Sequence, residues 1–132
     1  MTGVYSYIKG EANPGYNLFL NENDKAYLFD MEGEIVHTWK FPYNGFWEYG
    51  VIDDEGNLIA ECLNRGVVKL DWNSNVIWSV EMRAHHDVEI LPGDEGYLVP
   101  DRIEKEYMGR TVNFDLITHI SHDGRIIDSW ST

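Results

Sequence analysis

The chain has 132 residues and a formal net charge of −13 at pH 7. This length supports one domain with a modest core, and a hydrophobic share of 43% with an aromatic share of 14% predicts a folded domain, not a disordered chain. The acidic excess leaves no basic surface to neutralise nucleic-acid phosphates or an anionic membrane, so we expect neither as a partner.

No segment predicts export or membrane insertion. The opening MTGVYSYIKGEANPGY (1–16) lacks the apolar core of a signal peptide, and no apolar run reaches transmembrane length. The sequence therefore predicts a cytoplasmic protein, unless another route exports it. The single cysteine, Cys62, falls in an apolar strand-like run, which favours a buried thiol over a nucleophile.

Short apolar runs alternate with polar turns along the chain, and helical periodicity is nearly absent. In chain order the runs occupy 16–20, 26–39, 48–61, 66–80, 87–100 and 116–130. Turns such as DDEGN and SHDG divide the longer runs, with Gly56 and Gly124 supplying positive φ. This pattern predicts an all-β fold of antiparallel hairpins. Calcium binding by the Asp-rich turns is an alternative, but EF-hand spacing is absent, and we expect neither a resident metal nor a cofactor.

The hairpins repeat. AYLFDMEGEIVHTW (26–39), GVVKLDWNSNVIWSV (66–80) and LITHISHDGRIIDSW (116–130) are versions of one hairpin, and a second hairpin recurs at 48–61 and 87–100. Four strands in about forty residues are typical of a β-propeller blade.

The repeats predict a single domain, 1–132, with three four-stranded blades at about 1–43, 44–84 and 85–132. The innermost strand of the first blade is 4–8 or is supplied from elsewhere, and 102–115 inserts a longer charged loop. The last run ends at a blade boundary, so we expect a whole number of blades.

Three blades cannot close a ring, because known propellers have about four to eight blades. Each blade buries its faces only against its neighbours, so the first and last blades would each leave an apolar face open. We expect half of a six-bladed propeller, completed by a homodimer. The alternative is a fragment of a longer chain, or a module whose missing blades come from a larger assembly.

The motifs resemble those of the bacterial arylsulfotransferase-like propellers. They are PGYNLF (14–19), LFDMEGEIVHTW (28–39), LDWNSNVIW (70–78) and HHDVEILPGDEGYLV (85–99), in the same order as in that family. The resemblance implies a six-bladed propeller that transfers a sulfuryl group between phenols without a nucleotide donor, through a histidine in the central channel. Family enzymes are several hundred residues long, and this chain lacks their later blades.

The resemblance carries over to His85, His86 and Asp87 only. A neutral imidazole can accept a sulfuryl group, a cation must stabilise the transferring oxyanion, and Asp87 could orient an imidazole. Arg102, just beyond the partner strand, is the nearest candidate cation, with Arg83 and Arg65 as further ones. The alternative is structural: the three residues cap the entry of an inner strand.

Two functions follow as hypotheses. The first is an arylsulfotransferase-like enzyme, with a small aryl sulfate or phenol as substrate. The second is a non-catalytic propeller half for assembly or ligand binding. The remaining aromatic and histidine side chains are interpreted as packing for His37, Trp39, Trp78 and Trp130, and as solvated turns for His119 and His122.

Overall fold

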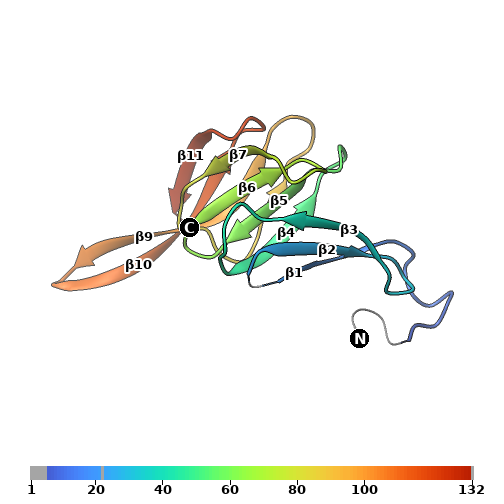
Figure 1. The fold of residues 1–132 in the computed structure, drawn as a ribbon. Helices are drawn as coiled ribbons and strands as arrows, with labels where there is room; N and C mark the ends of the chain where they lie inside the picture. Colours follow the sequence, from blue (N-terminus) through green and yellow to red (C-terminus); the bar gives the residue numbers. More distant parts are fainter. Residues whose placement is uncertain (1–5, 22, 132) are drawn as a thin grey trace.

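The computed structural model describes residues 6–21 and 23–131, and it confirms the expected all-β fold. The strands form three antiparallel sheets, each a simple meander in chain order (Figure 1). The first sheet contains β1 (Asn17–Leu20), β2 (Lys25–Phe29) and β3 (Ile35–Lys40). The second contains β4 (Trp47–Ile52), β5 (Leu58–Cys62), β6 (Gly66–Leu70) and β7 (Val76–Val80). The third contains β8 (Glu89–Ile90), β9 (Tyr97–Tyr107), β10 (Arg110–Ile120) and β11 (Ile126–Ser131).

Side-chain oxygens close the hairpin turns. In the β2–β3 turn, Oδ1 of Asp30 accepts hydrogen bonds from the backbone N–H groups of Glu32, at 3.0 Å, and Glu34, at 2.9 Å. Asp71 makes the equivalent pair in the β6–β7 turn, and the hydroxyl of Ser121 replaces the carboxylate in the β10–β11 turn. These bonds are local, so the turns follow directly from the sequence.

The second sheet lies between the other two (Figure 1). Every residue of β5 and β6 is buried, because one face of these strands packs on the first sheet and the other on the third. The contact with the first sheet contains Ala26, Leu28, Trp39, Phe41, Trp47, Leu58, Ala60, Cys62, Val68 and Leu70. The contact with the third contains Ile59, Val67, Trp78, Val80, Ala84, Val88, Tyr97, Val99 and Ile120.

A tryptophan side chain forms a hydrogen bond across each of the two contacts between neighbouring sheets. Nε1 of Trp39, on β3, donates to the carbonyl oxygen of Asp71 in the β6–β7 turn at 3.1 Å. Nε1 of Trp78, on β7, donates to the carbonyl oxygen of His122 in the β10–β11 turn at 3.0 Å. The turn under Trp78 requires glycine, because a Cβ on Gly124 would lie 2.5 Å from Cγ of Trp78. Both tryptophans therefore pack between sheets, as expected.

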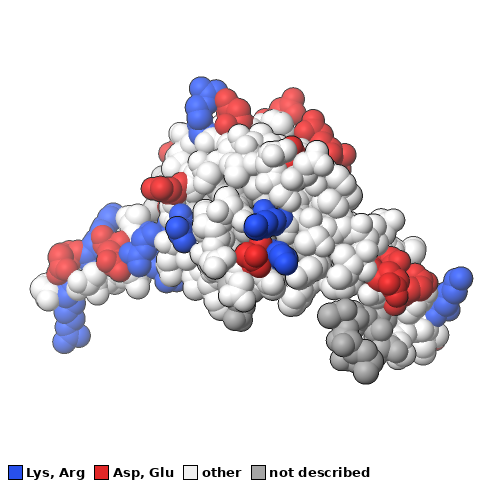
Figure 2. Space-filling view, in the orientation of Figure 1, with Lys and Arg blue, Asp and Glu red and all other residues white. Residues whose placement is uncertain are grey.

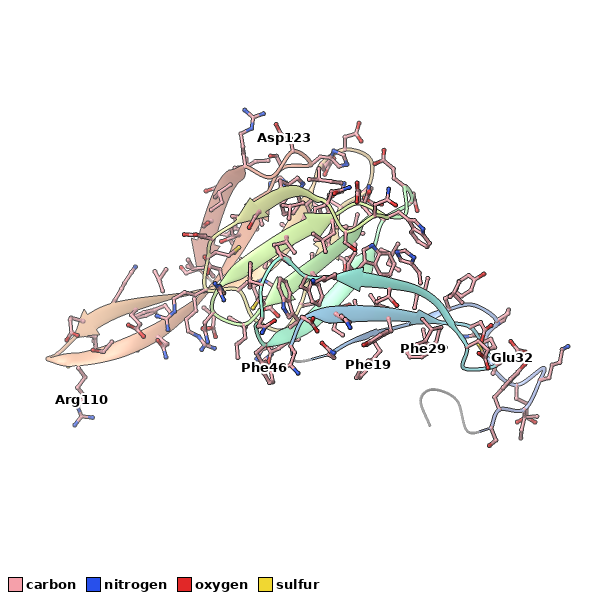
Figure 3. All side chains as sticks on the ribbon, viewed as in Figure 1. Phe19, Phe29, Glu32, Phe46, Arg110 and Asp123 are labelled. Atoms are coloured by element: carbon pink, nitrogen blue, oxygen red, sulfur yellow. The ribbon has the colours of Figure 1, made fainter. Side chains whose placement is uncertain are left out.

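Two outer faces lack a neighbouring sheet in the described part of the chain. Strand register places Phe19, Tyr27 and Phe29 on the face of the first sheet that points away from the second; Phe19 is exposed on this face, whereas Phe29 is buried. We call this the open face of the first sheet, and Figure 3 shows Phe19 and Phe29 on that side. Similarly, Leu98, Ile117 and Trp130 lie on the open face of the third sheet.

Two details differ from the sequence prediction. The first sheet has three described strands, not four: residues 4 and 5 of the expected inner strand lie outside the described residues, and 6–8 form no strand. Residues 102–115 are not an inserted loop. The pairing of β9 with β10 continues from the Tyr97/Ile120 pair to the Tyr107/Arg110 pair, and the far end of this hairpin projects from the body (Figure 1). Figure 2 shows acidic and basic side chains mixed along this projection. Residues 6–21 and 23–131 contain no helix long and apolar enough to cross a membrane.

Candidate functional site

His85 lies in the loop between β7 and β8, on the side of the third sheet. Its ring is almost fully buried, and its backbone N–H donates to the carbonyl oxygen of Pro100 at 3.2 Å. Nε2 of the ring lies 3.6 Å from Oδ1 of Asp115 on β10. Both ring nitrogens are buried, and neither has a hydrogen-bond partner among the described residues.

Arg102 approaches the same carboxylate. Its Nε lies 3.6 Å from Oδ1 of Asp115, which it faces across the β9–β10 pair. The structure thus places the predicted His85 and Arg102 around one carboxylate that the sequence patterns did not indicate. The signal that could have found Asp115 is the register of the long hairpin, which only the folded strands define.

His86 points elsewhere. Its side chain is 71% exposed, and Nδ1 lies 3.5 Å from Oε2 of Glu48 on β4. Its backbone is left-handed, with φ of +72°, which turns the chain sharply between two adjacent histidines. The two rings meet edge to face, 5.0 Å apart at their centroids. His85 therefore lies near Asp115, whereas His86 lies near Glu48.

Asp87 does not orient an imidazole. Its Oδ1 accepts the backbone N–H of Val88 at 2.8 Å, which caps the entry of the β8 region. Its charge also lies beside Tyr49, whose pKa is raised first by burial and then by Asp87. The expected contact between Asp87 and a histidine is thus replaced by a local backbone bond.

Glu61 on β5 is a second residue that the sequence patterns did not indicate. Its side chain is fully buried, and neither carboxyl oxygen has a hydrogen-bond partner among the described residues. Burial, reinforced by the charge of Glu48, raises the pKa of Glu61 to about 8, against a smaller opposing effect of the backbone N–H of His86. Glu61 therefore carries a proton at neutral pH.

The surroundings of the two histidines are mainly anionic. Glu48, Asp87 and Asp115 lie around them, while the guanidinium of Arg83 is paired with Glu104 at 2.8 Å. A sulfuryl-transfer site needs unpaired cations or N–H donors directed at the reacting oxyanion. In this region the two nearby arginines lie beside carboxylates, which weakens their field on an anionic ester.

A separate polar network lies between the second and third sheets. Nζ of Lys69, only 2% exposed, contacts Oδ2 of Asp53 at 2.9 Å, the hydroxyl of Tyr97 at 3.0 Å and Nε2 of His122 at 3.3 Å. Burial alone would lower the pKa of Lys69, but the hydrogen bonds to Asp53 and Tyr97 outweigh it and raise that pKa. His122 is exposed and lies in the β10–β11 turn, as predicted, and its ring also contacts this inter-sheet network.

His119 lies near the end of β10, beside the β10–β11 turn, where it was predicted. Its Nε2 contacts the carbonyl oxygen of Glu95 at 2.7 Å, which connects the β8–β9 turn to the third sheet.

A cavity of about 520 Å³ opens beside the Lys69 network. Its wall includes Asp53, Asp54, Glu55, Asp94, Tyr97 and His122. Among residues 6–21 and 23–131 no three His, Cys, Asp or Glu side chains are grouped so as to hold a metal ion. The cavity is thus an acidic hollow with a fully paired lysine beside it.

Comparison of the chain with known proteins finds no matching family model and no matching curated protein.

Proposed function

We propose that the chain is a non-catalytic half of a β-propeller, whose function is assembly: two copies associate and form a ring of six sheets. The observation that carries this proposal is the difference between the second sheet and the other two. The second sheet buries both of its faces against neighbours, whereas the first and third sheets each bury one.

Stacking in this chain has a direction. The first sheet presents Leu28 and Trp39 to the second, and the second presents Val67 and Trp78 to the third. If the third sheet packs on a following sheet in the same way, its open face contacts the open face of the first sheet of another copy. Two such contacts, related by a two-fold axis, close the ring without a new type of interface.

The open faces carry apolar surface that supports association. Phe19 is 56% exposed and Trp130 is 44% exposed, and each lies in a strand among other apolar side chains. Apolar surface removed from water contributes about 25 cal/mol per Å². Burying the open face of the third sheet against the open face of the first sheet of another copy therefore stabilises the dimer.

Charge on the open faces reduces the repulsion expected for an acidic chain. Register places Lys25 and Lys40 opposite each other on the open face of the first sheet. It places Asp115 and Asp128 on the open face of the third sheet, together with Arg102 opposite Asp115, so this face carries one more negative than positive charge among these three residues. Opposite charges on the two faces favour contact between unlike faces over contact between like faces.

The mass of the native protein tests the proposal. Sedimentation equilibrium over a range of micromolar concentrations is expected to give twice the chain mass of 15.3 kDa. A well-folded monomer throughout that range would contradict self-association. A Phe19→Glu variant, which puts a charge on the open face of the first sheet, is expected to be monomeric with an unchanged circular dichroism spectrum.

Sulfuryl transfer is the second candidate, favoured by the buried His85 ring and the Arg102 guanidinium, which both lie near Oδ1 of Asp115. In this reaction an imidazole nitrogen attacks the sulfur of an aryl sulfate and releases the phenolate. A second phenol then takes the sulfuryl group and frees the imidazole. The test is turnover of a chromogenic aryl sulfate with a phenol acceptor, comparing the native protein with His85→Ala and His86→Ala. Absence of turnover in folded protein removes this candidate, and turnover that depends on either histidine removes the non-catalytic proposal.

A further inference from the structure

We infer that Trp130 of one copy donates its indole N–H to the backbone carbonyl oxygen of Asp30 in a second copy, and that this bond sets the register of ring closure. The inference rests on the proposed self-association and adds to it the partner surface, the bonding atoms and the direction of contact.

The bond already exists twice inside the chain. Trp39 of the first sheet reaches the β6–β7 turn of the second at 3.1 Å, and Trp78 of the second reaches the β10–β11 turn of the third at 3.0 Å. Each donor is in the last strand of its sheet, and each acceptor is in the hairpin turn before the last strand of the next sheet. The two contacts differ in detail: Trp39 bonds to the first residue of the turn, whereas Trp78, two positions earlier in its strand, bonds to the second. Trp39 is therefore the closer precedent for Trp130.

Trp130 is the third donor of the series. It lies on β11, the last strand of the third sheet, and pairs with Ile117 on the open face. Ser121 precedes Trp130 by the same number of residues as Asp30 precedes Trp39, so the two tryptophans share one position relative to their own turns. Trp39 is fully buried, whereas Trp130 is 44% exposed, because no sheet within the described part of the chain covers it.

The β2–β3 turn is the matching acceptor. In the β6–β7 turn, the carbonyl oxygen of Asp71 accepts the N–H of Ser74 at 3.0 Å together with the indole of Trp39. In the β2–β3 turn, the carbonyl oxygen of Asp30 accepts the N–H of Gly33 at 3.1 Å, in the same arrangement. A carbonyl oxygen has two lone pairs, so Asp30 keeps one position for a donor.

One copy cannot make this bond with itself. The β2–β3 turn, where Figure 3 labels Glu32, and β11 lie on opposite sides of the molecule (Figures 1 and 3). The donor and the acceptor therefore meet only between copies. A ring of two copies contains the bond twice, once at each junction.

The first experiment replaces Trp130 with phenylalanine, which keeps an aromatic ring and removes the N–H. A net hydrogen bond changes an equilibrium about 2-fold to 12-fold, so losing two per dimer is expected to raise the dissociation constant about 5-fold to 150-fold. Phe46→Ala is the control, because Phe46 is 46% exposed in a loop outside both open faces. Sedimentation velocity measures both variants.

The result separates this inference from the proposed function. If the native protein is a monomer, self-association fails and the inference fails with it. If the native protein is a dimer and Trp130→Phe dissociates no more readily than Phe46→Ala, the dimer stands and the Trp130 bond is overturned. A selective weakening in Trp130→Phe supports the bond.

A second experiment tests the direction of contact. Phe19→Glu and Ile117→Lys place opposite charges on the two open faces. Each variant alone is expected to be monomeric, and a mixture is expected to regain dimers, because one junction is then native and the other pairs Glu with Lys. If unlike faces do not meet, mixing restores nothing and the head-to-tail register is overturned.

Discussion

The ammonium group of Lys69 lies 2.9 Å from a carboxylate oxygen of Asp53, in the contact between the second and third sheets. Lys69 comes from the centre of β6 and Asp53 from the end of β4, and Tyr97 and His122 complete the shell from the third sheet. All three donor positions of the ammonium group are used by side chains. The network therefore ties the two sheets together through polar bonds inside an otherwise apolar contact.

Removing this ammonium group is expected to destabilise the fold. Lys69→Met leaves the carboxylate of Asp53 without its cation, and breaking a buried pair in this way costs about 3 kcal/mol of unfolding free energy. Urea denaturation followed by tryptophan fluorescence measures the change. Lys105→Met, on the exposed part of β9, is the control and is expected to stay within about 0.5 kcal/mol of the native protein. Equal stabilities for the two variants would contradict a structural role for the network.

Glu61 is expected to make stability fall as pH rises. Its pKa is about 8 in the folded protein, against an ordinary value of 4.5, so the folded chain binds an extra proton between these two pH values. Stability from this group is fully present below about pH 4.5 and is lost as pH rises through about 8, by at most about 5 kcal/mol.

A Glu61→Gln variant tests this linkage, because the amide is neutral at every pH. Denaturant titrations at pH 5 and pH 9 are expected to show that the variant gains stability relative to the native protein at the higher pH. A constant difference between the two proteins across this range would show that Glu61 titrates normally.

Gly124 supports Trp78 through close contact. Gly124→Ala is expected to destabilise for two reasons: a φ of +82° is unfavourable for alanine by about 1 kcal/mol, and the new Cβ would overlap the indole. Gly109→Ala provides the matched control, because its φ is +72° and no atom lies within 4 Å of the Cβ position. The difference between the variants isolates the overlap, which we expect to add about 1–3 kcal/mol. Thermal denaturation of the pair measures it, and equal losses would show that Trp78 moves away freely.

His86 is expected to be dispensable for stability. It is exposed and left-handed, so His86→Gly relieves backbone strain and leaves stability unchanged or raises it by up to about 1 kcal/mol. His85→Ala, by contrast, removes a buried ring and is expected to lower stability by about 1–3 kcal/mol. Chemical denaturation compares the two. A larger loss in His86→Gly would mean that its contact with Glu48 matters more than its backbone strain.

The local features of this protein were predictable from the sequence. Alternating apolar residues, with Asp30, Asp71 and Gly124 at the turns, defined hairpins because their hydrogen bonds and φ angles involve residues a few positions apart. The burial of Cys62 followed in the same way, and burial is also the first cause of its raised pKa. The extended hairpin at 102–115 was missed because its charged, weakly alternating sequence reads as a loop when its partner strand is not considered.

The candidate site was predictable only in part, because tertiary structure decided which side chains meet. His85 and Arg102 were chosen from the sequence, but their common neighbour Asp115 depends on the β9–β10 register. The partners of Lys69 likewise come from two sheets, and His122 is far from it in sequence. Sequence alone determined the short hairpins and their turns, since local bonds are sufficient for them, but not the extended pairing of residues 102–115. The stacking of the sheets determined which charged side chains are buried and which sheet faces stay uncovered, because burial depends on which surfaces the packed chain removes from water.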